Sequence, residues 1–472
     1  MYKLKLSRQE DFLPEQPSPD APVFPCSEDL AVAAWLTSAD QTFLFQRQPD
    51  GLRFAENAND SLVITVDAGQ KYQVIEGFGF SLTGGSAILI SRLPDADRIK
   101  LLRELFLPDE DGIGVSFLRL SIGASDLSER CFTYNDMPAG QSDPELAQFD
   151  IEAGDLEVIP LLREILAINP KIKIMATAWS APPWMKTSLA FRGGKLKEDC
   201  YAIYAAYLVK YLQTMQDRGI TIHAITPQNE PLNQKNEPSM TMEASEQAAF
   251  IKHHLGPALW KAGLNEVELF CWDHNCDVPE YPLEVFADAE ARRYLTGSAW
   301  HLYGGDISAL SEVHQLYPDM KLYFTEQWVG SDGEFGGDLM WHARHVLIGS
   351  LRNWSRVVFE WNLASDPFCC PHTPGGEARC VGALTIGEAV SRNVAYYVIA
   401  HAAKFIRPGS VRIGSDQTAS LPNVAFATPA GYVVLIVLND GAEPQSFAIR
   451  YQGKHAIAAL PANTVATYVW PA

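Results

Sequence analysis

The chain has 472 residues, of which 47% are hydrophobic and 20% charged, and its formal net charge at pH 7 is -20. A chain of this length can bury a large core, and domains of about 50 to 250 residues predict one large domain with a smaller one. The acidic balance argues against a nucleic-acid partner, because phosphate binding requires basic patches. No apolar run approaches the ~18 residues of a membrane span, so we expect a soluble chain with an uncharged ligand.

The first residues, MYKLKLSRQEDFLPEQPSP, contain neither an apolar core region nor a small-residue cleavage site, and therefore do not resemble a secretory signal. We expect a cytoplasmic protein, or a secreted one whose signal has been removed. The eight cysteines, from Cys26 to Cys380, are irregularly spaced, which does not indicate a disulfide framework. The clusters CWDHNC and CCPH lack the paired spacing of a zinc site, so we expect no metal site.

Between residues 72 and 404, a short apolar run followed by a segment of helical periodicity recurs eight times. Parallel strands that are covered on both faces have continuous apolar sequences, and eight such units predict a closed (β/α)8 barrel. An open doubly wound sheet is the main alternative, but no strand is followed by a nucleotide-binding glycine pattern. The expected strands are 73–83, 115–123, 171–181, 221–230, 267–275, 298–303, 321–328 and 356–363. Helices are expected at 155–169 and 200–216, the first with an apolar stripe of Leu156, Ile159, Leu162, Ile165 and Leu166.

After residue 404 the pattern changes to short alternating strands at 423–440, 446–460 and 463–470. Two similar runs, 41–48 and 61–69, precede the barrel. We therefore expect both chain ends to join in one β-sandwich that flanks the barrel. The expected division is an N-terminal segment of residues 1–71, a catalytic barrel of residues 72–404 and a C-terminal β-sandwich domain of residues 405–472.

The active site of such a barrel lies at the C-terminal ends of its strands. Several carboxylates and tryptophans are predicted there, and aromatic faces beside hydrogen-bonding groups suit a pyranose ring. Hydrolysis of a glycosidic bond requires two carboxyl groups, but the residues alone leave open which pair acts. The candidates at the predicted strand ends are Glu76, Arg119, Asp126, Trp179, Trp184, Asn229, Glu230, Asp273, His274, His301, Tyr303, Glu326, Trp328, Glu360, Trp361 and Asn362.

Some of these candidates are expected to be structural. Arg119 lies on an apolar strand and requires a buried partner, for which a carboxylate is the natural choice. Glu76 is expected to form an ion pair or to cap a loop, and Glu360 and Asp273 to hold neighbouring side chains in place. A single histidine at the rim is as often structural as catalytic.

Seven motifs along the barrel are similar to those of a known family: EGFGFSLTGGSA, FLRLSIGASDLS, ATAWSAPPWMK, TPQNEP, HLYGGD, YFTEQW and EWNLASDP. In this order they resemble glycoside hydrolase family 30, which includes glucosylceramidases and bacterial β-1,6-glucanases. The resemblance covers nearly the whole barrel. It implies a retaining β-glycosidase that needs no cofactor.

Carried over to this chain, the resemblance implies that Glu230 is the acid/base and Glu326 the nucleophile of a double displacement. Asn229 would bind the sugar 2-hydroxyl, Tyr303 would orient Glu326, and Arg119 would support it. In a retaining enzyme the two carboxyl groups lie about 5 to 5.5 Å apart, whereas a distance beyond ~6.5 Å indicates inversion. We also expect the charge of the neighbouring nucleophile to raise the pKa of the acid/base. The non-reducing glucose would be bound by Asp126, Trp179 and Trp361, with His301 close by.

The expected substrate is a β-glucoside, as for glucosylceramidases, with β-1,6-glucan or a β-fucoside, β-xyloside or β-galactoside as alternatives at the same site. The long polar loop at 365–386 weakens the case for a ceramide aglycone. Two other classes of protein are alternatives. One is a carbohydrate-binding barrel without catalysis, which the presence of both Glu230 and Glu326 opposes. The other is a metal-dependent hydrolase. The latter would need more histidines at strand ends than His274 and His301. The sequence does not indicate an oligomeric state.

Overall fold

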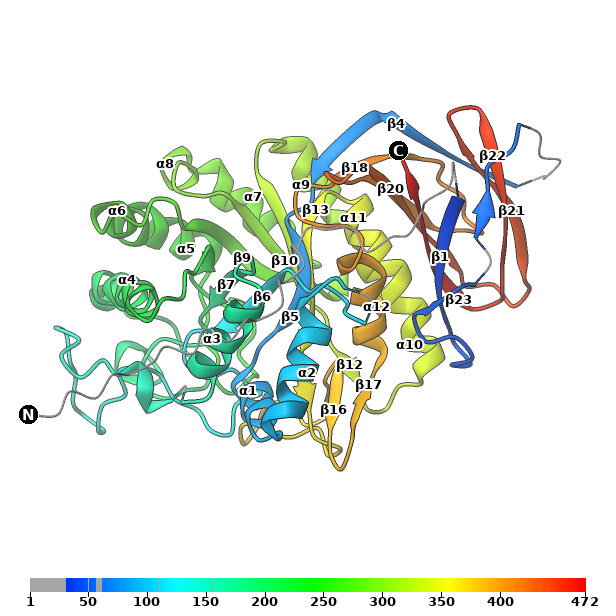
Figure 1. The fold of residues 1–472 in the computed structure, drawn as a ribbon. Helices are drawn as coiled ribbons and strands as arrows, with labels where there is room; N and C mark the ends of the chain where they lie inside the picture. The colour runs from blue at the N-terminus through cyan, green and yellow to red at the C-terminus, as the bar shows by residue number, and fades with distance from the viewer. Residues whose placement is uncertain (1–30, 50, 57–61, 110, 155) are drawn as a thin grey trace, which may run out of the picture.

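The computed structural model describes residues 31–49, 51–56, 62–109, 111–154 and 156–472; the N-terminal segment with Cys26 lies outside these ranges. Within them, eight parallel strands form a closed barrel, and their order around the barrel follows the sequence (Figure 1). This confirms the predicted barrel. The strands are β5 (Gly77–Ser81), β6 (Phe117–Ser121), β7 (Lys173–Thr177), β8 (Ala224–Thr226), β9 (Glu268–Cys276), β10 (Gly297–Gly305), β11 (Lys321–Glu326) and β13 (Ser355–Asn362).

The barrel strands are apolar on both faces because each face packs against a different layer. On β6, Phe117 belongs to a cluster of side chains inside the barrel, whereas Leu118 belongs to the main hydrophobic core. The inner cluster takes side chains from seven of the strands and fills the space beneath the site. Its members are Phe117, Met175, Ala224, Phe270, Ala299, Tyr323, Val357 and Phe359.

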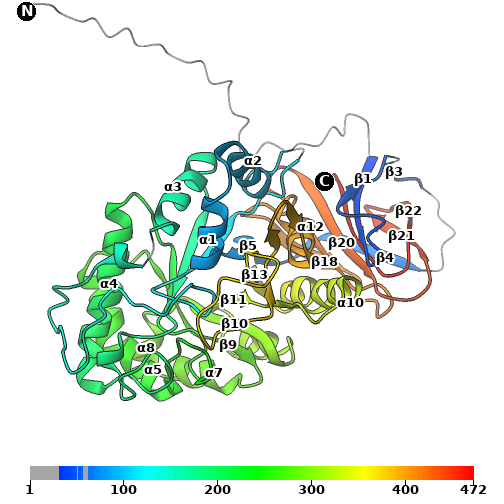
Figure 2. The same ribbon diagram turned by 90° about the horizontal axis from the view of Figure 1, so that it is seen from below.

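Helices surround the barrel, as both ribbon views show (Figures 1 and 2). In α3 (Val158–Ile168) the predicted apolar stripe is buried at Ile159, Leu162 and Ile165, but Leu156 precedes the helix and is 66% exposed, so its assignment to the stripe is wrong. The other helices are α1 (Gly84–Ser91), α2 (Asp95–Phe106), α4 (Tyr201–Asp217), α5 (Ala244–Phe250), α6 (Gly256–Lys261), α7 (Glu280–Ala287), α8 (Ala289–Arg292), α9 (Ala309–Leu316), α10 (Phe335–Trp341), α11 (Ser350–Arg352) and α12 (Val394–Ala403). Short 3-10 turns are η1 (Ile151–Ala153), η2 (Pro183–Met185) and η3 (Glu198–Cys200), and π-helical turns are η4 (Ile251–Leu255) and η5 (His342–Gly349).

Both chain ends build the flanking β-sandwich, in which the blue and red segments lie side by side (Figure 1). The first strand, β1 (Ala31–Ser38), pairs antiparallel with the last, β23 (Thr464–Pro471). The sequence did not predict β1, and of the run 41–48 only β2 (Gln46–Arg47) is a strand. The remaining strands are β3 (Leu52–Arg53), β4 (Val63–Val74), β18 (Val411–Ser415), β19 (Asn423–Ala427), β20 (Tyr432–Asn439), β21 (Gln445–Tyr451) and β22 (Lys454–Leu460).

The β-sandwich packs against the barrel, so residues of one sandwich strand contribute to two different cores. On β20, Val433 and Leu435 belong to the core of the sandwich, whereas Val434 and Ile436 belong to the main core. Helix α12 packs against barrel strands β5 and β13 and against β23, and so joins the two parts. The limits 1–71, 72–404 and 405–472 stay a prediction.

A cluster of ion pairs around Glu76 lies at the N-terminal end of the barrel. Glu76 precedes β5, so it lies at the end of the barrel opposite the strand C-termini, and its predicted place at the rim is wrong. It forms ion pairs with Lys321 (2.8 Å) and Lys173 (3.1 Å), as the structural interpretation of this residue predicted.

Among the described residues, every helix is too short or too polar to cross a membrane. The short strands are β12 (Val329–Gly330), β14 (Ala364–Ser365), β15 (Cys380–Val381), β16 (Leu384–Ile386) and β17 (Val390–Arg392).

Candidate active site

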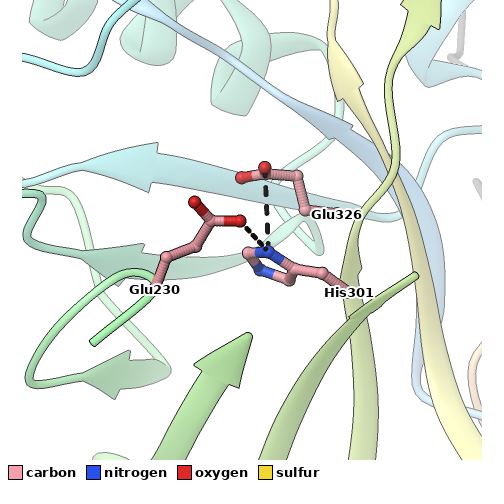
Figure 3. Close-up of side chains that lie close together, drawn as sticks. All are labelled: Glu230, His301 and Glu326. Carbon is pink, nitrogen blue, oxygen red and sulfur yellow. Dashed lines mark hydrogen bonds and ion pairs between the residues drawn. The ribbon is translucent and has the colours of Figure 1, made fainter. Parts of the chain in front are cut away.

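Three side chains from different barrel strands meet at the C-terminal end of the barrel (Figure 3). Glu326 is the last residue of β11, His301 lies on β10, and Glu230 follows β8 by four residues. One ligand atom of each, including a carboxylate oxygen of Glu230 and one of Glu326, lies within 4.8 Å of the others. His301 lies between the two acids, with Nδ1 3.1 Å from Glu230 Oε1 and 3.8 Å from Glu326 Oε1.

Glu326 is held by a donor at each of its oxygens. The Arg119 guanidinium donates to Oε2 at 2.6 Å, and the Tyr303 hydroxyl donates to Oε1 at 3.0 Å. Arg119, which is fully buried, also donates to Asn229 Oδ1 at 2.7 Å and to Asp273 Oδ2 at 3.0 Å. A single guanidinium therefore fixes three side chains of the site.

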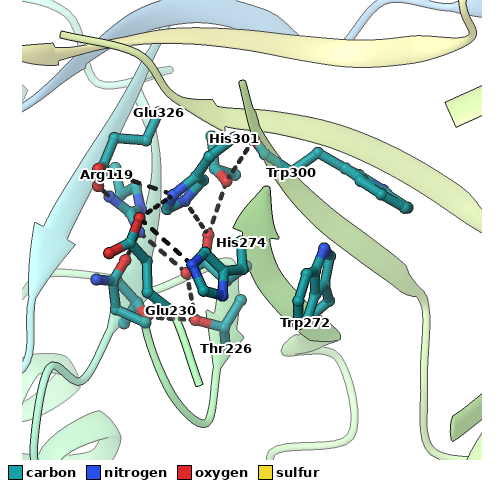
Figure 4. Close-up of polar contacts among 12 residues, drawn as sticks. Arg119, Thr226, Glu230, Trp272, His274, Trp300, His301 and Glu326 are labelled. Carbon is teal, nitrogen blue, oxygen red and sulfur yellow. Dashed lines mark hydrogen bonds and ion pairs between the residues drawn. The ribbon is translucent and has the colours of Figure 1, made fainter. Parts of the chain in front are cut away.

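In the buried polar network around Arg119, Thr226 and His301, which Figure 4 labels, the central group is Asp273. The hydroxyls of Thr226 and Thr325 both donate to it at 2.7 Å, and His301 Nε2 lies 3.0 Å away. Burial opposes its ionisation, but the charge of Arg119 and the contact with His301 outweigh burial and hold the pKa of Asp273 well below its usual range. Asp273 therefore stays ionised and fixes the His301 ring.

The His301 ring carries a proton at neutral pH. Burial lowers its pKa, but the charge of Glu326 and the hydrogen bonds to Asp273 and Glu230 raise it to about 9. Burial also opposes ionisation of Glu230, yet the hydrogen bond from His301 and the charges of His274 and His301 lower the pKa of Glu230 to about 2. Burial raises the pKa of Glu326. The expected rise of the Glu230 pKa is therefore wrong for the free site, because sequence reasoning counted the charge of Glu326 but not the imidazolium.

An aromatic wall and a further carboxyl border the two acids. The rings of Trp179 and Trp361 lie 5.2 Å apart, and the Arg119 guanidinium lies 5.0 and 5.5 Å from their centroids. Asp126 is buried beside Leu127, which packs on the same two tryptophans. Burial and the charges of Glu326 and Glu230 raise the pKa of Asp126 to about 7. This wall places two indole rings, which are 2% and 4% exposed, and one carboxyl beside the two acids.

Other predicted rim residues have structural contacts. The Trp184 indole donates to Asn135 O at 3.0 Å, and Glu360 contacts His342 Nδ1 at 2.8 Å. Asn362 accepts from Thr83 and Ser86, the N-terminal residues of the α1 region. Trp328 carries the Arg379 guanidinium 5.3 Å from its centroid. His274 lies near the acids, with Nε2 3.9 Å from Glu230 Oε1.

The sequence did not single out three residues that contact this network. Thr226 and Thr325 end or nearly end their strands, and their spacing in the chain carries no signal of a shared partner. Asn233 donates from Nδ2 to Glu230 Oε2 at 2.7 Å. Its position three residues after Glu230 is the one signal that could have found it, because a turn brings such residues together.

Among the described residues, the group that could hold a metal ion is Glu230, His301 and Glu326. The His301 nitrogens both contact carboxylates, and the raised pKa of about 9 keeps the ring protonated, which opposes metal ligation. In the CWDHNC segment, burial raises the pKa of Cys271 and Cys276, so neither provides a thiolate. The chemistry of this donor set is that of a proton-transfer site.

Two facing carboxyl groups at the C-terminal end of a (β/α)8 barrel, with an aromatic wall beside them, define a glycoside hydrolase. The chain belongs to glycosyl hydrolase family 30: the TIM-barrel domain of that family matches residues 75–406 and its β-sandwich domain matches residues 409–468. The predicted enzyme class is thereby confirmed.

Relatives with described activities match along most of the chain. Endo-1,6-beta-D-glucanase from Neurospora crassa is 33% identical over 88% of this chain and 89% of its own length. Lysosomal acid glucosylceramidase of Mus musculus is 27% identical over 88% of this chain and 85% of its own. Among solved structures, the endo-beta1,6-glucanase BT3312 has a TM-score of 0.86 and 33% identity, covering 94% of this chain and 100% of its own.

Proposed function

We propose that the protein hydrolyses β-glucosides with retention of configuration, and that β-1,6-linked glucan is its preferred substrate. The observation that carries this proposal is the facing pair Glu230 and Glu326, of which one carboxylate oxygen each lies within 4.8 Å of the other. Retaining glycosidases have carboxyl groups about 5 to 5.5 Å apart, and inverting ones about 6.5 to 9.5 Å. The shorter separation leaves no room for a water between the second carboxylate and the sugar, so that carboxylate attacks directly.

In the first step, Glu326 attacks the anomeric carbon while the bond from that carbon to the leaving oxygen breaks. The electron pair of the broken bond takes the proton of Glu230, which leaves a covalent glycosyl-enzyme. In the second step Glu230 removes a proton from water, the hydroxide attacks the anomeric carbon, and Glu326 leaves as the carboxylate. Arg119 and Tyr303 orient Glu326 because each donates to a different oxygen.

The two roles of Glu230 need opposite protonation states, and the coupling to Glu326 provides the change. While Glu326 is ionised, its negative charge favours the protonated form of Glu230. Formation of the covalent bond removes that charge, and the donors His301 and Asn233 then favour the ionised form, which is the base. Because these donors also act in the free site, the reaction is favoured at acidic pH.

The aromatic wall of the site and the identities to relatives of described activity support β-1,6-glucan as the substrate. Trp179 and Trp361 provide ring faces for the sugar, Asp126 a hydroxyl partner, and Asn229 a contact to the 2-hydroxyl, which strengthens in the transition state. Endo-1,6-β-D-glucanases of Neurospora crassa and Trichoderma harzianum are 33% and 32% identical to this chain, whereas the glucosylceramidases are 27% to 30% identical. This order favours β-1,6-glucan over glucosylceramide.

The test compares linear β-1,6-glucan, β-1,3-glucan, glucosylceramide in detergent and a panel of p-nitrophenyl β-glycosides. We expect turnover of β-1,6-glucan, with the β-anomer as the first product in proton NMR spectra. Release of the α-anomer would refute retention, and loss of activity in EDTA would favour a metal-dependent hydrolase.

Two variants test the roles of the acids. Glu326→Gln should abolish turnover, and Glu230→Ala should regain hydrolysis of substrates with good leaving groups when azide is added. If Glu326→Gln kept most of its rate, the nucleophile would be another residue. No rescue of Glu230→Ala would count against the acid/base assignment.

A further inference from the structure

Asn233 lies in the loop that leaves β8 and touches the proposed acid/base. Its Nδ2 donates to Glu230 Oε2 at 2.7 Å, while His301 Nδ1 lies 3.1 Å from Glu230 Oε1. The two oxygens of one carboxyl group are therefore held from two sides. His301 is fully buried, whereas Asn233 is partly exposed.

The amide of Asn233 is locked in the donating orientation. Its Oδ1 accepts the backbone N–H of Lys235 at 2.8 Å, which only the oxygen of an amide can do. The amide nitrogen must therefore face Glu230. A rotation of the amide by 180° would place two oxygens against each other and would leave the Lys235 N–H facing a donor.

The backbone fixes the distance between the two residues. Asn233 N donates to Glu230 O at 2.9 Å, which closes a turn from Glu230 to Asn233. Glu230 itself adopts a left-handed conformation with φ 45°, outside the extended region that a residue before proline prefers. The Asn233 amide and the Glu230 carboxyl are thus parts of one rigid turn rather than two independent side chains.

We propose that Asn233 is a positioning residue for acid catalysis: its locked amide holds the Glu230 carboxyl in the orientation from which it protonates the leaving group. This inference deepens the proposed function and rests on it, because it requires that Glu230 is the acid/base. A fixed carboxyl loses less orientational freedom on reaching the transition state. The bond also favours the ionised form of the carboxyl, as any donor does.

Several other groups act on Glu230 and set its ionisation together with Asn233. His274 and His301 lower its pKa, and the charge of Glu326 acts in the opposite sense. Among the described residues, Asp126 and Tyr303 are further titratable groups on whose pKa the charge of Glu230 acts. None of these is altered by a substitution at residue 233, so a change in the pH profile of such a variant reports on the Asn233 contact.

The experiment compares Asn233→Ala, Asn233→Ser and Asn233→Asp with the parent enzyme, using a 2,4-dinitrophenyl β-glucoside and a β-1,6-linked glucose disaccharide. The dinitrophenolate leaves without a proton, whereas the sugar requires one. For Asn233→Ala we expect the pH-independent maximum of kcat/KM, on the acidic side of the limb, to fall about 10- to 100-fold on the disaccharide and less than about threefold on the dinitrophenyl substrate. Asn233→Ser, which keeps a donor, should recover part of the loss.

The pH profile gives the second readout. In the Ala variant the basic limb of kcat/KM should move up by about one pH unit, because a lost donor raises the pKa of Glu230. In the Asp variant, which has the same shape but can carry a negative charge, the limb should move further. Asn265→Ala is the matched control, because Asn265 also donates to a glutamate, Glu266, at 3.2 Å on an exposed loop. It should change neither readout.

Equal losses on both substrates with an unmoved basic limb would overturn the inference and leave Asn233 a structural residue. The proposed function fails in a different way. If azide does not rescue Glu230→Ala, the acid/base assignment is wrong, and the inference falls with it. If azide rescues that variant while the Asn233 variants leave the limb unmoved, the inference alone is wrong. Thermal melting checks that each variant is folded. If Asn233→Ala does not fold, Asn233→Ser takes its place in both measurements.

Discussion

Replacing Arg119 by Met should destabilise the barrel as well as abolish turnover. The guanidinium is fully buried and holds Glu326 at 2.6 Å, Asn229 at 2.7 Å and Asp273 at 3.0 Å. Met fills the space but leaves two carboxylates without their cation, and breaking a buried pair in this way costs about 3 to 5 kcal/mol. With an unfolding entropy of about 2.1 cal/mol/K per residue over the barrel, residues 75–406, the melting temperature should fall by roughly 4 to 7 °C.

The decrease in melting temperature of the Arg119→Met variant should depend on pH. Arg119 holds the folded-state pKa of Asp273 well below its unfolded value of about 3.9, despite burial. A carboxyl with a depressed pKa stabilises the fold above its unfolded pKa, and that contribution disappears as the pH falls toward the folded value. The variant lacks this contribution. The difference in melting temperature between parent and variant should therefore be largest near pH 7 and should shrink below about pH 4.

Calorimetry at pH 7 and at pH 3.5 measures the difference, with Arg92→Met as the matched control. Arg92 pairs with Glu129 at 3.5 Å, and both side chains are more than half exposed, at 68% and 56%. Such a pair contributes about 0 to 1 kcal/mol, so its loss should shift the melting temperature by less than about 1.5 °C. The reasoning would be refuted if Arg119→Met melted like the control, or if its deficit were the same at both pH values.

Three further outcomes are expected. Tyr303→Phe removes the donor to Glu326 at 3.0 Å and should lower kcat/KM about 10-fold with an unchanged melting temperature; a loss in KM alone would contradict an orienting role. For the parent, kcat/KM should be higher at acidic than at neutral pH, because the donors to Glu230 lower its pKa to about 2 and so deplete the protonated acid as the pH rises; a rate that increases from pH 5 to pH 8 would contradict this. Glu76→Gln, at the opposite end of the barrel, should lower the melting temperature while kcat and KM stay within about twofold; a large loss of turnover would contradict its structural role.

The barrel could be predicted because its strands have a clear physical signature. Each is apolar on both faces, and segments with helical periodicity separate them. β1, with the sequence AVAAWLTS, was missed although it is also buried on both faces. A single apolar run with no helical partner next to it in the chain carries no information about its pairing, and its partner β23 lies more than 400 residues away.

The site was predictable to the extent that residues at strand ends converge in a barrel. Glu76 shows the limit: it lies near the start even of the predicted strand 73–83, and in the structure it falls between β4 and β5, so its carboxyl lies at the end of the barrel opposite the two acids. The protonation of His301 was not predictable either. It depends on Asp273 and Glu230 lying on opposite sides of one ring, which no spacing in the sequence reveals.

Backbone strain in the middle of β9 is what connects the network to the acid/base. Trp272 and Asp273 are consecutive residues with φ 72° and 67°, a conformation that costs about 1 to 3 kcal/mol for a residue other than glycine. The register between β9 and β10 shifts at the same point. The bends turn Asp273 toward Arg119, Thr226, Thr325 and His301, and these contacts offset the cost. A glycine would relieve the strain at residue 273 but would remove the carboxylate that holds Nε2 of His301. Nδ1 would then lose its fixed direction toward Glu230, so the strained backbone is a condition of the charge state of the acid/base.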